Sequence, residues 1–343
     1  MKINLKKILV SPWTALLTLA LVVGIRTADP TFVESVRLRY FDTLITAKEP
    51  TFNNIVTVNI DEDSLNKYGQ WPIPRAQTAN IVRDLYQRGA GLVVLNVLMS
   101  ETDRTGGDGA LGQTLTQFPV VLSSTPAQKT KNIPRVPGSA VINSEFADQI
   151  VTYPGLIANV PQLENNAAGV GITNTLPEVD GVNRRMPLLV TVDGKLYPSL
   201  SLETLRVAAG DSTVQVKMFE GGIEKMRIPK FGPISTDSLG RVWIDWSQQN
   251  RSFSLSKLPK DLEGAIVIVG PTAAGIGNPL PTAKGAVWPQ DVHAALIGTM
   301  MNGVVIQRPD WADGAEILAL VVSGILLLFL TRWVYVGLAS TVG

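Results

Sequence analysis

The chain has 343 residues, with 30 basic and 29 acidic side chains and no cysteine. The near-neutral balance argues against a general electrostatic attraction to nucleic acid, and the missing thiols exclude disulfides and cysteine chemistry. Apolar residues make up 45% of the chain, which is enough for a large buried core.

Two apolar segments have the length of membrane spans. Residues 8–25 follow a cluster of lysines within residues 1–7, and the segment is longer than the apolar core of a usual cleaved signal peptide. We therefore expect a retained signal anchor there, with cleavage as the alternative. Residues 314–331 are apolar on all faces and lie between Trp311 and Trp333, as interfacial anchors often do.

The lysine cluster sets the expected orientation. By the positive-inside rule, residues 1–7 are cytoplasmic, so the main domain, residues 26–313, lies outside the membrane. Residues 332–343 are then a cytoplasmic end or the start of a truncated third span.

The first half of the outer segment alternates helices and strands, which is typical of a parallel sheet with crossover helices. We predict a helix over residues 32–49, ended by Pro50, and then a strand over 54–60, a helix over 75–88, a strand over 91–99, a helix over 108–117 and a strand over 119–124.

The second half is more irregular. We predict strands over 167–175 and 186–192, a helix over 198–210, short antiparallel strands over 213–219, 224–228 and 241–246, a buried strand over 264–270 and a helix over 289–303. The predicted fold is α/β: a mixed, mostly parallel sheet with crossover helices and an antiparallel insertion, flanked by transmembrane helices.

Polar residues follow several of the predicted parallel strands. Ligands of open parallel sheets bind beyond the carboxyl ends of the strands, so we expect these residues to form a crevice for a small ligand or a cation. The alternative is that they cap helices and form a polar rim. The candidate ligand-binding residues are Asp61, Asn96, Glu101, Asp103 and Thr272.

No strong enzyme or metal motif is present. The chain lacks G-x-S-x-G, H-E-x-x-H, Walker A and a complete G-x-G-x-x-G. Residues 61–66 match a calcium loop only in part, because Asn66 stands where that loop needs glycine. The single histidine, His293, excludes multi-histidine metal sites and is expected to bond a neighbouring loop. We therefore predict no catalytic residue, metal or cofactor.

The stretch GQWPIPR is interpreted as a brace that positions the loop carrying Asp61. Gly69 permits a left-handed turn, and Pro72 and Pro74 are expected to hold the chain extended. Trp71 would pack against the sheet as an anchor.

Arg75 opens a predicted helix, where its positive charge is poorly matched to the helix dipole. A carboxylate would compensate, and Asp61 or Asp103 is the expected partner. We favour an internal salt bridge over a ligand contact for Arg75.

With these residues in place, the stretch VNIDEDSLNKYGQWPIPR resembles the opening signature of the type-two CHASE domain family. Later stretches agree in order: DGVNRRMPLLV, YPSLSLETLR, TDSLGRVWIDW, and residues 264–303 with their His-Ala helix. The resemblance covers residues 32–303. The sequence departs from the family pattern at Asn96, where the family commonly has Asp, and at Met99, where the family commonly has an aromatic residue.

The resemblance implies an extracytoplasmic, ligand-sensing input module of a transmembrane receptor, with its main domain in the bacterial periplasm and its anchor in the inner membrane. Family members are associated with cyclases, histidine kinases and Ser/Thr kinases; no such output domain is present in this sequence. We expect a homodimer in contact with membrane lipid, and an unknown small ligand. The alternatives are a membrane-anchored enzyme that uses the acidic crevice and a homologue that is inert in signalling.

Overall fold

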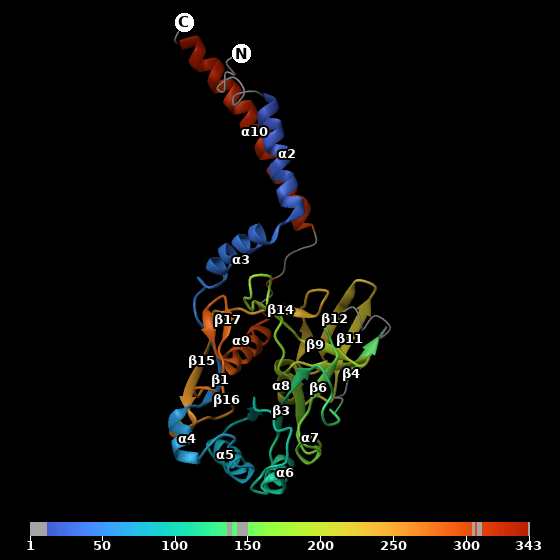
Figure 1. Ribbon diagram of the computed structural model, residues 1–343, viewed down its shortest axis with the longest axis vertical. Helices are drawn as coiled ribbons and strands as arrows, with labels where there is room; N and C mark the ends of the chain where they lie inside the picture. Colours follow the sequence, from blue (N-terminus) through green and yellow to red (C-terminus); the bar gives the residue numbers. More distant parts are fainter. Residues whose placement is uncertain (1–11, 136–138, 143–149, 304–305, 307–310, 342–343) are drawn as a thin grey trace. The chain divides into compact units, whose positions relative to one another are not determined.

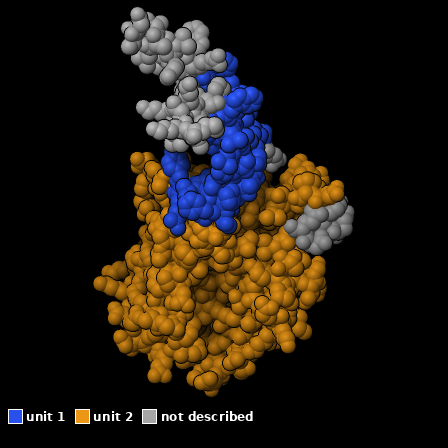
Figure 2. Space-filling view, turned by 45° about the horizontal axis from the view of Figure 1, so that its top comes forward, with its two compact units in different colours: residues 1–40, 308–343 blue, residues 41–307 orange. Residues whose placement is uncertain are grey.

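The computed structural model describes residues 12–135, 139–142, 150–303, 306 and 311–341. The chain divides into two compact units (Figure 2). Residues 1–40 and 308–343 form one, which we call the helical unit, and residues 41–307 form the other, which we call the α/β unit.

The helical unit contains two long helices, α2 (Pro12–Ala28) and α10 (Ala312–Thr341), and most of a third, α3 (Thr31–Ile45). Helices α2 and α10 run side by side (Figure 1). Helices from the first and last described parts of the chain therefore belong to one unit.

An ion-pair cluster and a close packing contact lie between α2 and α10. Arg26 lies 2.6 Å from both Asp313 and Glu316. Further along the pair, Gly324 packs directly against Leu19, because a Cβ atom on the glycine would lie 2.5 Å from the leucine Cδ1. Both contacts are specific to one alignment of the two helices.

The centre of the α/β unit is a seven-stranded sheet. Its strands, in spatial order, are β15 (Gln248–Ser254), β1 (Thr51–Ile60), β16 (Ile266–Pro271), β2 (Leu92–Leu95) and β3 (Val120–Ala127), which pairs with both β6 (Gly155–Ile157) and β7 (Gly169–Ile172). Every pairing is parallel except that of β3 with β6. The predicted α/β class with a mostly parallel sheet is confirmed.

Alternating side chains give this sheet two buried faces. On β16, Ile266 and Ile268 join one apolar cluster, while Val267 and Val269 join the other. Burying such a side chain contributes about 1.5–3 kcal/mol, so the sheet carries much of the stability of the unit. The covering helices are α5 (Arg75–Gln87) and α6 (Asp108–Gln117) on one face and α8 (Leu200–Ala208) and α9 (Pro289–Met301) on the other.

Smaller sheets and helices complete the unit. A four-stranded sheet has the order β13 (Gly232–Ile234), β12 (Gly222–Ile228), β11 (Val214–Phe219) and β4 (Ser139–Ile142), and a three-stranded sheet has the order β10 (Lys195–Pro198), β9 (Leu189–Val192) and β5 (Thr152–Tyr153). Two two-stranded sheets pair β14 (Arg241–Trp243) with β8 (Arg185–Pro187) and β17 (Leu280–Thr282) with β18 (Gly285–Val287). The short helices are α4 (Glu62–Tyr68), α7 (Pro161–Glu164) and η2 (Leu255–Lys257).

The structure differs from the predicted elements at several places, among them the end of the helix expected over 32–49, which stops at Ile45, and the strand expected over 186–192, which is two strands, β8 and β9. The strand expected over 91–99 ends at Leu95, and residues 96–99 have no regular secondary structure. Helix α4 occupies residues that were interpreted only as an acidic cluster. Strand β15 was missed because its residues, QQNRSFS, are mostly polar and lack an apolar alternation.

Two glycines in β7 allow α8 to lie very close to the sheet. A Cβ atom on Gly171 would lie 2.5 Å from Cα of Leu200, and one on Gly169 would lie 2.5 Å from Oε1 of Glu203. These glycines, which look like part of a dinucleotide motif in the sequence, therefore serve packing between a helix and a strand.

We expect Gly171→Ala to lower the free energy of unfolding by about 1–3 kcal/mol, because the added methyl group would force the backbone of α8 away from β7. Urea unfolding of the detergent-solubilised chain measures this. The matched control is Gly109→Ala in α6, where the nearest heavy atom to an added Cβ is 3.7 Å away. Equal stability of the two variants would contradict the expectation.

Candidate functional site

The carboxyl ends of the central strands lie next to one another. Asp61 and Thr272 follow the neighbouring strands β1 and β16, and the amide of Thr272 donates to the carbonyl of Ile60 at 3.0 Å. Asn96 follows β2 on the other side of β16, and its amide donates to the carbonyl of Val269 at 2.8 Å. The backbone arrangement is therefore the one that a shared crevice would need.

The carboxylate of Asp61, however, caps a helix. It accepts hydrogen bonds from the amide of Ser64 at 2.9 Å, from the Ser64 hydroxyl at 2.5 Å and from the Ser254 hydroxyl at 2.9 Å. Burial alone would raise the pKa of Asp61, but these bonds hold that pKa below its usual value. Asp61 thus begins α4 and joins it to the end of β15.

Asp103 turns back onto the start of α5. Its carboxylate accepts from the amides of Arg75 at 3.1 Å and Gly107 at 2.9 Å, and from the Thr105 hydroxyl at 2.7 Å. Burial would raise the pKa of Asp103, but the bonds from Thr105, Arg75 and Gly107 lower it to about 2. This residue supplies the helix cap that Pro74 is chemically unable to provide.

Glu101 is exposed and pairs with Lys131, whose Nζ lies 3.0 Å from its Oε1. The hydrogen bond from Lys131 lowers the pKa of Glu101. Within the described residues, the side chains of Asn96 and Thr272 make no hydrogen bond. The five candidate residues therefore have separate partners or none, and these contacts favour capping and a polar rim. Ligand binding by these five residues stays a prediction.

Arg75 is buried and makes its contacts within the protein. Its guanidinium donates to the carbonyl of Glu101 at 2.9 Å and lies 3.6 Å from Oδ1 of Asp108. The prediction that Asp61 or Asp103 pairs with the Arg75 side chain is wrong, because Asp103 accepts only from the backbone amide of Arg75. The starts of α5 and α6 lie close together, and the carboxylate that faces the guanidinium is that of Asp108.

The brace stretch is bent as well as extended. Gly69 ends α4 with a φ of 103°, the turn expected for glycine. The peptide bond between Trp71 and Pro72 is cis and lies in a bend, so the expected extended chain is wrong there. Pro74 is extended, and Trp71 is half-buried against the apolar cluster beneath α5.

His293 is buried in α9. Its Nδ1 lies 2.9 Å from the hydroxyl of Ser201, so its partner belongs to helix α8 and the expected loop partner is wrong. Burial lowers the pKa of His293 to about 4, which keeps the ring neutral near pH 7.

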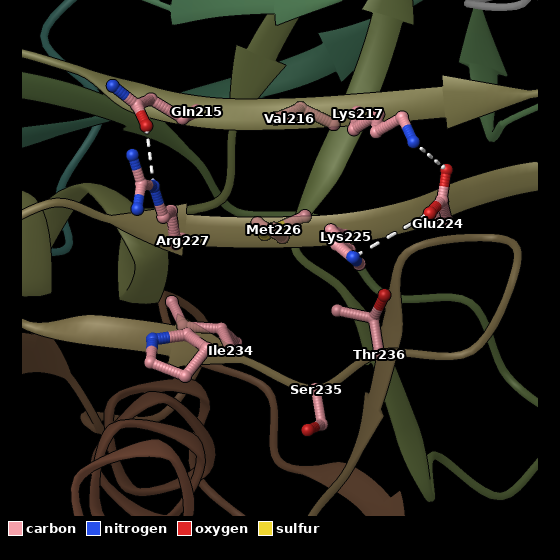
Figure 3. Close-up of a pocket in the computed structure, with 11 residues that line it drawn as sticks. Gln215, Val216, Lys217, Glu224, Lys225, Met226, Arg227, Ile234, Ser235 and Thr236 are labelled. Carbon is pink, nitrogen blue, oxygen red and sulfur yellow. Dashed lines mark hydrogen bonds and ion pairs between the residues drawn. The ribbon is translucent and has the colours of Figure 1, made fainter.

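One hollow lies on the sheet of β11, β12 and β13 and has a volume of about 540 Å³ (Figure 3). Its polar side chains pair with one another. Lys217 lies 2.7 Å from Glu224, and Arg227 donates to Gln215 at 2.6 Å. These groups are already satisfied, which leaves little chemistry for a ligand.

A smaller hollow, about 290 Å³, lies between β15, the β17–β18 hairpin and the start of α9. The sequence expectations do not include it, although the run WSQQN at residues 246–250 places an indole next to amide- and hydroxyl-bearing groups. Its side chains with functional groups include Trp246, Gln248, Asn250, Lys284, Trp288 and Asp291. Among the described residues, no group of acidic and histidine side chains could hold a metal ion.

Comparison with known families assigns the chain to the extracytoplasmic sensory domains. The chain belongs to the CHASE2 domain family, whose model matches residues 17–330, nearly the whole chain. The resemblance noted from the sequence is confirmed. Searches of curated proteins and of solved structures gave no match. Because the family is sensory, we expect no enzymatic activity from this domain.

Proposed function

We propose that the chain is the input module of a membrane receptor, and that it binds a small ligand outside the cytoplasmic membrane. The observation that carries this proposal is the family match, which runs from residue 17 in α2 to residue 330 in α10. The matched region therefore includes most of the two terminal helices as well as the α/β unit.

The helices support a membrane anchor to different degrees. In α10, Ala312–Leu330 is long and apolar enough to cross a bilayer, with a mean hydropathy of 2.1. Helix α2 has 17 residues and passes the same criteria only together with α3, from which it is bent by 79°. The ion pairs of Arg26 with Asp313 and Glu316 would neutralise the charges at one end of the helix pair.

Helix α3 would carry the signal. Its last turn belongs to the α/β unit, where Ile45 is buried in the apolar core and Asp42 binds Arg184. Its first turns belong to the helical unit. A ligand that favours one arrangement of the α/β unit would therefore move α3 and, through it, the anchor.

The orientation is testable because the chain has no cysteine. We expect Asn278→Cys, in an exposed loop of the α/β unit, to react with a membrane-impermeant maleimide in intact spheroplasts. Lys6→Cys is the matched control and should react only after the membrane is permeabilised. Protection of the Asn278→Cys variant in intact spheroplasts would place the α/β unit inside and end the proposal.

We also propose that a second copy of the chain covers α3. The helix exposes four apolar side chains at four-residue spacing, each more than half exposed: Phe32, Val36, Tyr40 and Leu44. Single-cysteine variants test this in native membranes. Val36→Cys should form a disulfide-linked dimer on mild oxidation, whereas Glu34→Cys, on the opposite side of the helix, should not. Failure of Val36→Cys to cross-link, or equal cross-linking of both variants, would contradict a dimer through this face.

The two alternatives receive less support. An enzyme that uses the acidic crevice would need carboxylates free for chemistry, yet Asp61 and Asp103 cap helices and Glu101 pairs with Lys131. No contact in the described residues favours a homologue that is inert in signalling.

A further inference from the structure

A polar layer separates α9 from the edge of the central sheet. In most of the unit, apolar side chains fill the space between helices and sheet, as is usual for this architecture. Here β1, β15 and α9 contribute amides, hydroxyls and a carboxylate. The residues of this polar layer are Asn53, Thr57, Asn59, Gln248, Asn250, Ser252, Gln290, Asp291 and Asn302.

Gln248 is held in one orientation within this layer. Its side-chain oxygen accepts hydrogen bonds from Asn53 at 2.7 Å and from Asn302 at 2.8 Å. In this arrangement both partners donate through their side-chain nitrogens, so the Gln248 oxygen is the acceptor and its nitrogen is left without a partner among the described residues. The amide nitrogen is therefore a donor with a defined position.

That nitrogen and one neighbouring group lack a hydrogen-bond acceptor in the described part of the chain. They are the Nε2 of Gln248 and the Nε1 of Trp246, which are buried in side chains that are only 6% and 4% exposed. Both residues line the smaller hollow. Folded proteins leave few buried donors unsatisfied, because each one costs free energy, so two at one hollow indicate an absent acceptor.

Asp291 supplies a hydrogen-bond acceptor to the same hollow. Its Oδ1 accepts from Thr57 at 2.7 Å and from Asn250 at 2.9 Å, whereas its Oδ2 receives no hydrogen bond from the described residues. Asn250 stands two residues after Gln248 in β15, which is roughly 7 Å along a strand. Donors and acceptor are therefore separated by a short distance that suits a small molecule.

The remaining walls fit a small charged ligand. The Trp246 and Trp288 side chains line the hollow, and Lys284 projects from the turn between β17 and β18 without an anionic partner in the described residues. The hollow thus has one positive and one negative side chain, and neither is paired with the other.

From these contacts we propose that the smaller hollow binds a small zwitterion, of which a free amino acid is the simplest example. Its carboxylate accepts from Trp246, Gln248 and the ammonium of Lys284, and its ammonium group donates to Oδ2 of Asp291. This assignment rests on the proposed sensory function, and gives that function a site and a ligand class. The site is separate from the carboxyl edge of the sheet that the sequence indicated.

The test uses the full chain in detergent and measures its thermal unfolding with glycine, L-alanine, L-serine and β-alanine at millimolar concentration. At least one of these should raise the midpoint temperature, because it binds only the folded state. Its N-acetyl derivative lacks the ammonium group and its methyl ester lacks the carboxylate. Neither should raise the midpoint, and glucose, a neutral polyol, should not do so either.

Two variants locate the site by calorimetric titration with the amino acid that binds. Gln248→Glu exchanges a donor for an acceptor of the same shape, and Asp291→Asn removes the negative charge. Each should weaken binding by about tenfold or more. The control is Lys217→Met in the larger hollow, which should bind as the wild type does. If one variant fails to fold, as judged by its own unfolding curve, the other still decides.

Each result has a distinct meaning. Binding that survives both variants would overturn this site and leave a sensory function elsewhere on the chain intact. Binding of glucose or of the blocked derivatives in place of amino acids would overturn the zwitterion. Absence of binding by every compound would overturn the proposal. An inward-facing α/β unit in the maleimide experiment would instead overturn the sensory function, whatever binds.

Discussion

Arg184→Met should lower the free energy of unfolding by ~3–5 kcal/mol, the usual loss when one partner of a buried ion pair is removed. The Arg184 guanidinium is fully buried between two carboxylates. It lies 2.7–2.8 Å from both oxygens of Asp42 and 2.8 Å from both oxygens of Asp180. Without it, two carboxylates of like charge would face each other in the protein interior.

The control for this prediction is Lys217→Met, which removes a cation from an exposed pair. Lys217 and Glu224 are 44% and 36% exposed, and such solvent-screened pairs contribute little to stability. Urea unfolding of both variants, followed by tryptophan fluorescence, measures the difference. A loss for Arg184→Met as small as that of the control would show that the buried pair adds little to stability.

Acidification from pH 7 to pH 4 should weaken the fold by ~3 kcal/mol through His293 alone. Burial lowers the pKa of His293 to about 4, while the unfolded chain has a value near 6.5. The unfolded state therefore binds the proton first. The stability is fully present above about pH 6.5 and is lost progressively as the pH falls toward 4.

The experiment compares the pH dependence of the free energy of unfolding in the wild type and in His293→Gln. Carboxylates titrate in both proteins, so the informative quantity is the free energy of unfolding of the wild type minus that of His293→Gln. This quantity should fall by ~3 kcal/mol between pH 7 and pH 4. Ser201→Ala keeps the imidazole and should retain the wild-type slope. A difference that is constant with pH would refute a depressed pKa.

The elements that the sequence predicted well are those with a strong apolar pattern. Helix α6 begins and ends at the predicted residues, and β1, β16, α5 and α9 lie within a few residues of theirs. Strand β15 carries amides and hydroxyls toward α9, so its sequence resembles a loop. Its strand character comes from pairing with β1, which only the assembled sheet provides.

The candidate site was predictable to a lesser extent. The order of strands places Asp61, Asn96 and Thr272 at neighbouring strand ends, as parallel topology requires. Which partner each carboxylate takes depends on loop conformation, and Asp103 turns onto the start of α5 through bonds that strand order does not predict. The smaller hollow joins residues 246–252 to residues 284–295, and no local pattern connects those segments.

The two contacts between α2 and α10 have a mechanical consequence. Arg26 and Leu19 are seven residues apart, roughly 10 Å along the helix, and each is held to α10. Each contact favours one axial register of the two helices, and the two contacts together also oppose rotation of one helix relative to the other. Sliding one helix along the other would have to break both contacts. A signal that leaves the contacts intact would therefore tilt or turn the two helices together.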